Sequence, residues 1–311
     1  VLAVFASDAE DYRFTFTAKE TEFDDKMQMV TKQTEAKRFT YVLGPNESCK
    51  TPADRFFKLH EQKDSVALEN VVDAFSVETL NDEFFKKYKE HYENFVQFIT
   101  GKRIKKVSGK WKEVEIHEPN VYLATIFDND NKQARDFVKK LLGRMVFLQF
   151  LQKKAWMGCS ADNSEWKNGD HTFCKSLFES ASQDQFHSGY LAPLFDALNT
   201  PNRENDIFDL TKTRVPYLNG GLFEADSEAI RQMNFPASHF ENLLKFFGEY
   251  NFTIDENDPN DHEVGIDPEM LGHIFENLLE DNKDKGVFYT PKPIVQYMCQ
   301  ESLIQYLKTH L

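Results

Sequence analysis

The sequence predicts an α+β fold that is predominantly α-helical, and two observations lead to this. Up to about residue 60, short stretches alternate polar and apolar side chains, as strands do, whereas apolar residues recur at helical spacing from about residue 65 onward. The 41% apolar and 14% aromatic content suffices for sizeable cores and excludes intrinsic disorder. We expect a small β-rich segment over residues 1–64, a mostly helical region over 65–265 and a separate segment over 266–311.

Two strands are predicted in the first segment. Residues 12–16 alternate apolar and polar side chains, and residues 38–43 form an apolar run that ends at Gly44-Pro45-Asn46, a sequence typical of turns. The first segment should therefore contain a small sheet.

Helices are predicted through the middle of the chain. An apolar stripe over residues 68–75 predicts a short helix, and Thr79 should open a longer one that ends at Gly101. A helix over 132–154 is apolar all round at residues 145–151 and should therefore be central to the bundle. Further helices are expected at 172–181, 189–198 and 238–248.

A β-hairpin with Ser108-Gly109 at its turn is predicted over residues 102–117. Residues 101–154 carry 13 basic and 6 acidic side chains and are the only segment with a positive balance, since 155–311 carry 11 and 26. Six basic residues of the hairpin form a candidate contact for DNA phosphates: Lys102, Arg103, Lys105, Lys106, Lys110 and Lys112. The alternative is a solvated edge hairpin whose charges prevent pairing with other chains.

The last 45 residues contain two predicted helices joined by a short strand. Asp267 and Pro268 begin the first helix, and residues 287–289 form the strand. Thr290 can then cap the final helix, with Pro291 at its first position.

No stretch is long and apolar enough for a membrane span, and the first residues lack the basic start of a signal peptide. We therefore expect a cytoplasmic protein of bacterial type without a membrane partner. The chain begins with Val1, which indicates a piece of a longer protein.

The run GVFYTPKPIV at residues 286–295 resembles motif X of the gamma-class adenine-N6 DNA methyltransferases, in the form found in type IIG restriction-modification enzymes. Four upstream segments are similar, in the same order, to the helical connector of that family: 84–89, 141–154, 215–224 and 266–279. The resemblance covers roughly residues 65–311. It implies that 65–265 is the connector and that 266–311 begins the methyltransferase domain.

The resemblance implies S-adenosylmethionine as the cofactor and double-stranded DNA as the partner. Phe288 and Tyr289 would wall the methionine arm, and Thr290 with Pro291 would offer a helix N-terminus to its carboxylate. The alternative is a strand-to-helix turn in which Thr290 is only a cap.

The remaining motifs of the family are missing. The chain has no Gly-x-Gly and no Pro-Pro pair, so both the glycine-rich cofactor loop and the Asn-Pro-Pro-Tyr loop that holds a flipped adenine are absent. No catalytic residue is therefore assigned, and we expect this chain alone to be inactive and the whole enzyme to transfer methyl groups to adenine in DNA.

An endonuclease using Mg²⁺ commonly accompanies such methyltransferases. Three Glu-x-Lys triplets occur, at Glu35, Glu61 and Glu165, about as many as the composition gives by chance. Asp24 and Asp25 make the first triplet the best candidate.

We predict no metal site. Cys159, His171, Cys174 and His187 match no familiar zinc spacing, and the acidic run 255–261 lacks the glycine and closing glutamate of a calcium loop. The rival function is a non-enzymatic helical scaffold whose acidic C-terminal half binds a basic partner or mimics DNA.

Overall fold

A small sheet near the N-terminus and a larger group of helices make up the first of two compact units, residues 1–267, and the second unit is residues 268–311. The computed structural model describes residues 2–6, 12–18, 22–23, 29–30, 37–45, 47–107, 110–162, 165–218, 220–253, 261–277 and 292–310. The predicted boundary at residue 64 stays a prediction.

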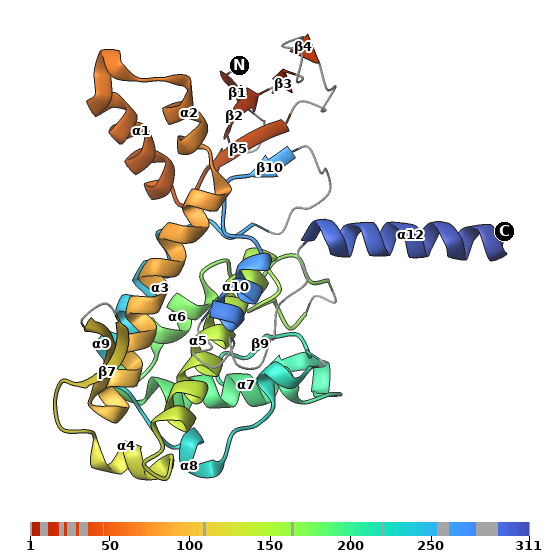
Figure 1. Cartoon of the computed structure of the whole chain (residues 1–311). Coiled ribbons are helices and arrows are strands. Elements are labelled where there is room, and N and C mark those ends of the chain that lie inside the picture. Colours follow the sequence, from red (N-terminus) through yellow and green to blue (C-terminus); the bar gives the residue numbers. More distant parts are fainter. Residues whose placement is uncertain are drawn as a thin grey trace. The chain divides into compact units, whose positions relative to one another are not determined.

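The sheet has four strands in the order β1-β2-β5-β10 (Figure 1). Their bounds are Leu2–Ala6, Tyr12–Ala18, Lys37–Leu43 and Asp261–Glu263. Neighbouring strands are antiparallel except that β10 runs parallel to β5. Two short strands, β3 (Glu22–Phe23) and β4 (Met29–Val30), pair separately. The strands predicted over 12–16 and 38–43 are thus confirmed.

Aromatic residues join the sheet to helices α1 (Lys50–Gln62) and α2 (Leu68–Ala74). The Phe75 ring lies 5.3 to 5.5 Å from the rings of Phe14, Tyr41 and Phe56. Tyr41 is fully buried and its hydroxyl donates to the Ala74 carbonyl at 2.7 Å. Apolar burial and a satisfied hydroxyl thus fix the two helices on the sheet.

The expectation of a β-rich first segment is wrong for residues 50–62, because α1 occupies them. The inward face of α1 has a short apolar stripe of Pro52, Phe56 and Leu59, and beside it lies the buried Arg55. Arg55 donates from Nη1 to the carbonyls of Asp73, Ala74 and Ser76 at 3.3, 3.2 and 3.0 Å. Tertiary hydrogen bonds of Arg55 therefore add to the apolar packing of Phe56 in holding this helix.

Helix α3 (Val77–Thr100) runs from α1 and α2 to the main helical group (Figure 1). It begins two residues before the predicted Thr79, because the Ser76 hydroxyl caps it by accepting from the Thr79 amide at 3.1 Å. It ends at Gly101 as predicted, with φ at +70°. A Cβ at Gly101 would lie 2.1 Å from the His117 carbonyl oxygen, so only glycine fits there.

The main helical group surrounds helix α5 (Asn131–Lys153), and its other members come from residues 121–247. They are α4 (Val121–Ile126), α6 (Phe173–Ser180), a π-helical turn (His187–Leu191) that leads into α7 (Ala192–Asn199), α8 (Glu228–Arg231) and α9 (Ala237–Phe247). A short pair of strands, β8 (Ile207–Phe208) and β9 (Thr213–Arg214), also lies in this region.

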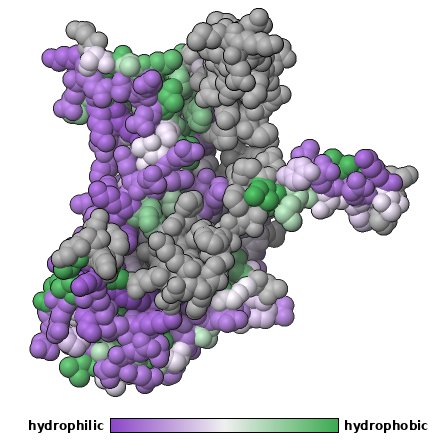
Figure 2. All heavy atoms as spheres, in the orientation of Figure 1, coloured by the Kyte–Doolittle hydropathy of each residue, from purple (hydrophilic) through white to green (hydrophobic). Residues whose placement is uncertain are grey.

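Helix α5 is central, as its all-round apolar stretch predicts. Leu141, Leu142, Met145, Val146 and Leu148 have no exposed surface. Hydrophilic residues make up most of the coloured surface over α1 and α3 in Figure 2. The predicted α+β class with mostly helical content is confirmed.

The second unit contains α10 (Glu269–Asn277) and α12 (Lys292–His310). Ile294, Met298 and Leu303 of α12 are 50 to 58% exposed. Among the helices in the described parts of the chain, none combines the length and apolarity that a membrane crossing needs.

Candidate nucleic-acid interface

The predicted basic hairpin is present, and its strands are β6 (Lys102–Val107) and β7 (Lys110–Glu115). The antiparallel register pairs Lys102 with Glu115 near the base, where opposite charges face each other. Further out it pairs Lys105 directly with Lys112, and both are exposed. Neither lysine has an ion pair with any residue that the structure describes.

The base of the hairpin is fixed by charges that neutralise one another. Glu93, which is 4% exposed, accepts from the Ile104 amide at 3.1 Å and pairs with Arg135 at 3.3 Å. Arg135 also pairs with Glu113 of β7 at 3.5 Å, and Glu113 accepts from Asn131 at 3.1 Å. The acids of this region are therefore engaged by partners at the base, and the distal lysines are not neutralised by them.

Like charges placed directly opposite on a hairpin destabilise it by a few tenths of a kcal/mol to about 1 kcal/mol. Natural edge strands use lysine above all to prevent pairing with other chains, so the Lys105–Lys112 register is compatible both with an edge hairpin and with a contact to an anion. The side chains of Lys106 and Lys110 lie outside the described set.

The predicted cofactor residues Phe288, Tyr289, Thr290 and Pro291 lie outside the described residues, as does the predicted strand 287–289. The structure describes the final helix from Lys292 onward. The cofactor assignment and the capping alternative therefore both stay predictions.

A buried arginine joins two of the segments that resemble the connector. Arg144 of α5 is 1% exposed and donates to the carbonyls of Leu222 and Glu224, both at 2.7 Å. Its Nη1 donates to Asp226 Oδ2 at 2.5 Å. The guanidinium also lies 4.8 Å from the centre of the Phe195 ring.

The Arg144 cluster has coupled charges. Burial raises the pKa of Asp226, but Arg144 and Lys140 beside it outweigh burial, so the net shift is downward. Lys140 Nζ lies 2.9 Å from Asp226 Oδ1. Sequence reasoning assigned no role to Arg144, although a lone arginine within the apolar run 141–151 signals a buried cation that needs an acidic partner.

Among the described residues, the candidate metal ligands Cys159, His171, Cys174 and His187 are not brought together into a metal site. His187 Nδ1 lies 2.9 Å from the Met233 carbonyl, and Cys159 Sγ donates to the Ala155 carbonyl at 3.2 Å. Glu165 and Lys167 form an exposed ion pair at 3.3 Å, while Asp24, Asp25 and Glu35 lie outside the described residues. Within the described ranges, no group of three or more His, Cys, Asp or Glu residues could hold a metal ion.

Comparison with known proteins gives a distant relative. The chain is 26% identical over 233 residues to a protein of Methanocaldococcus jannaschii named "Putative type II restriction enzyme and methyltransferase". The match includes 69% of this chain and 19% of the relative, so the chain spans about a fifth of that protein. No known protein family matches the chain, and no solved structure matches it significantly. The chain is thus distantly similar to a protein named for both restriction and methylation.

Proposed function

We propose that this chain is the helical connector, with the first methyltransferase elements, of a type IIG restriction-modification enzyme that transfers a methyl group from S-adenosylmethionine to adenine in DNA. The observation that carries the proposal is the M. jannaschii similarity, which agrees with the resemblance of 286–295 to motif X. The adenine specificity and the cofactor rest on that resemblance. Since the relative's name includes a restriction enzyme, we include an endonuclease using Mg²⁺ in the proposed whole enzyme.

The role proposed for the hairpin is to hold DNA phosphates. The distal lysines carry this proposal, because Lys105 and Lys112 face each other across the strands without an acidic partner among the described residues. A phosphate between the two ammonium groups would relieve their repulsion. Such contacts position DNA and do not read its sequence.

Removing the two lysines should flatten the salt dependence of DNA binding. In the full-length gene product, Lys105→Gln with Lys112→Gln should lower the slope of log Kobs against log salt by about 0.9 per lost contact, and about 1.8 for the pair. Binding should weaken alike for every DNA sequence. Fluorescence anisotropy with duplexes of two unrelated sequences, over a range of salt concentrations, measures this.

The matched control removes the same charge elsewhere. Lys86→Gln with Lys154→Gln changes two exposed lysines that have no ion pair with a described residue. Lys86 lies four turns of α3 away from Gly101. An equal change of slope in both double variants would contradict the hairpin proposal, because it would report net charge alone.

The cofactor proposal predicts a ligand-specific effect at Thr290. Thr290→Val should lower stability by about 0.5 to 2 kcal/mol if the hydroxyl only caps the final helix. If the hydroxyl also orders the cofactor site, the affinity for S-adenosylmethionine should fall by more than the folded fraction explains, since a charge-assisted hydrogen bond contributes about 1.5 to 3 kcal/mol. Calorimetric titration of the full-length product, well below both melting points, makes the comparison.

Equal affinities would reduce Thr290 to a structural cap. Absence of any cofactor binding by the unchanged protein would favour the rival, a non-enzymatic helical scaffold.

A further inference from the structure

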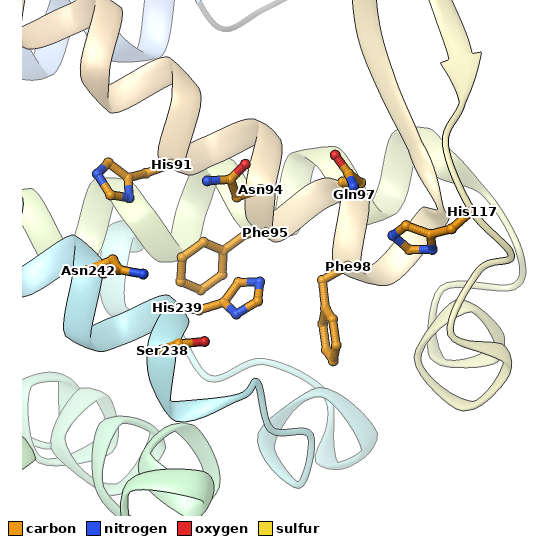
Figure 3. A pocket seen from close by; sticks show the side chains of 9 residues that line it. All are labelled: His91, Asn94, Phe95, Gln97, Phe98, His117, Ser238, His239 and Asn242. Carbon is orange, nitrogen blue, oxygen red and sulfur yellow. The ribbon is translucent and has the colours of Figure 1, made fainter.

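A polar pocket lies between helices α3 and α9, next to the base of the hairpin (Figure 3). Its volume is about 270 Å³. Histidine and carboxamide side chains supply most of its polar groups, and they are His91, Asn94, Gln97, His117, His239 and Asn242. Figure 3 shows these groups around the Phe95 and His239 rings, which point toward each other from the two helices.

The pocket has no fixed charge. None of the described residues that line it is Asp, Glu, Lys or Arg. Burial lowers the pKa of His91 and of His239, so both rings are neutral at pH 7 and each offers one N–H donor and one acceptor. A ligand that fits this lining is uncharged within the pocket and has both donors and acceptors.

One atom of the lining lacks a partner, although the His239 ring has a hydrogen bond with the Asn94 backbone. His239 Nδ1 is buried and has no hydrogen-bond partner among the described residues. The ring itself is held in place, because it packs edge-on against Phe95 at 5.0 Å and lies 5.1 Å from the Phe98 ring. The His239 ring is thus a fixed part of the pocket wall, and its Nδ1 is a buried polar atom that the described residues leave unsatisfied.

Aromatic surface and carboxamides together suit a nucleobase. Carboxamide side chains form paired hydrogen bonds with the amino group and ring nitrogen of adenine, and a base can stack on the half-buried Phe98 ring, whereas Phe95 is 1% exposed and only backs the pocket. The volume lies just below the range of about 300–1,000 Å³ typical of ligand pockets, so the pocket has room for one base.

The pocket adjoins the proposed phosphate contacts. Arg103 of β6 donates from Nη1 to Asn94 Oδ1 at 3.2 Å, so a lining residue is tied to the hairpin. His117 follows β7 by two residues, and its amide donates to the Gly101 carbonyl at 3.2 Å. A strand whose phosphates lie on the hairpin would therefore pass the mouth of the pocket.

We infer that this pocket binds one unpaired nucleobase, presented by DNA whose phosphates lie on the hairpin. The inference deepens the proposed function and rests on it for the source of the base. A free nucleoside carries the same chemistry, so the experiment distinguishes the two sources.

The test compares three probes at one salt concentration, using the full-length gene product. They are a duplex with a single unpaired adenosine, the same duplex with an abasic residue at the unpaired position, and adenosine alone. The two duplexes have the same backbone charge and differ chemically only in the unpaired base. Since stacking of one base contributes on the scale of a tenfold change in affinity, the adenosine bulge should bind about tenfold more tightly than the abasic bulge.

The variant Asn242→Leu should bring that ratio close to one while leaving the affinity for the abasic duplex unchanged. Asn242 is exposed on α9 and leucine is a better helix former, so the variant should fold normally. The matched control is Gln62→Leu, which removes an exposed carboxamide from α1 and should keep the ratio. The double variant Lys105→Gln with Lys112→Gln should weaken the binding of both duplexes alike. The ratio of the two affinities should therefore stay the same.

Normal binding of both duplexes with a ratio of one in the unchanged protein would overturn the inference and leave the DNA proposal standing. If neither duplex binds, the DNA proposal fails. In that case, saturable binding of adenosine that Asn242→Leu abolishes would support a site for a free nucleoside. If adenosine does not bind either, the inference about the pocket is overturned as well.

Discussion

Replacing Arg144 with methionine should lower the free energy of unfolding by about 3–5 kcal/mol, because it breaks a buried charge pair by removing one partner. Asp226, whose side chain is 13% exposed, would keep only Lys140 as a cation. The carbonyls of Leu222 and Glu224 would lose their guanidinium donors. Urea unfolding followed by circular dichroism measures the difference.

The control for this variant is Arg231→Met. Arg231 pairs with Asp196 at a partly exposed position, where the two side chains are 36 and 33% exposed, so its loss should change stability by about 1 kcal/mol or less. An effect of Arg144→Met no larger than that of the control would show that the Arg144 cluster does not hold α5 to residues 222–226.

Acid should destabilise the protein through His187, which is 2% exposed. Burial lowers the pKa of this ring to about 4, whereas it is about 6.5 in the unfolded chain. Between these values the unfolded state takes up a proton that the folded state does not, so stability falls as the pH drops below about 6.5. The contribution should reach about 3 kcal/mol near pH 4 and then level off.

The variant His187→Asn isolates this contribution. Its amide can still donate to the Met233 carbonyl, but it does not titrate, so the fall in stability between pH 7 and pH 4 should be smaller by about 3 kcal/mol than in the unchanged protein. The comparison uses the pH dependence of the free energy of unfolding, which is independent of any constant loss from the smaller side chain. Equal profiles for His187→Asn and the unchanged protein would contradict the assignment.

Local patterns were enough to predict the elements with strong periodicity. Helix α3 and its end at Gly101, the hairpin, and the central position of α5 follow from apolar spacing and turn residues. Helix α1 was missed because its apolar stripe is short, Pro52, Phe56 and Leu59, and its buried Arg55 is satisfied by carbonyls of residues 73–76. Such a partner is visible only once the chain has folded.

The candidate site was predictable in composition and not in arrangement. The sequence shows a cluster of basic residues over 102–112, but only the register places Lys105 opposite Lys112 and Lys102 opposite Glu115. The pocket joins α3 to α9, which are more than 130 residues apart in sequence, and its histidines carried no recognisable spacing. The apolar run around Arg144 indicates a buried cation, but no pattern in the sequence identifies Asp226 as its partner.

Methyl transfer tests the central proposal most directly. The full-length gene product is incubated with S-adenosylmethionine labelled in its methyl group and with DNA of mixed sequence, and the DNA is then digested to nucleosides. We expect label on N6-methyl-2′-deoxyadenosine above a heat-killed control, and none when the 311-residue chain is used alone, because that chain has neither a Gly-x-Gly nor a Pro-Pro pair. Label confined to cytosine, or no label with the full-length product, would contradict the proposal.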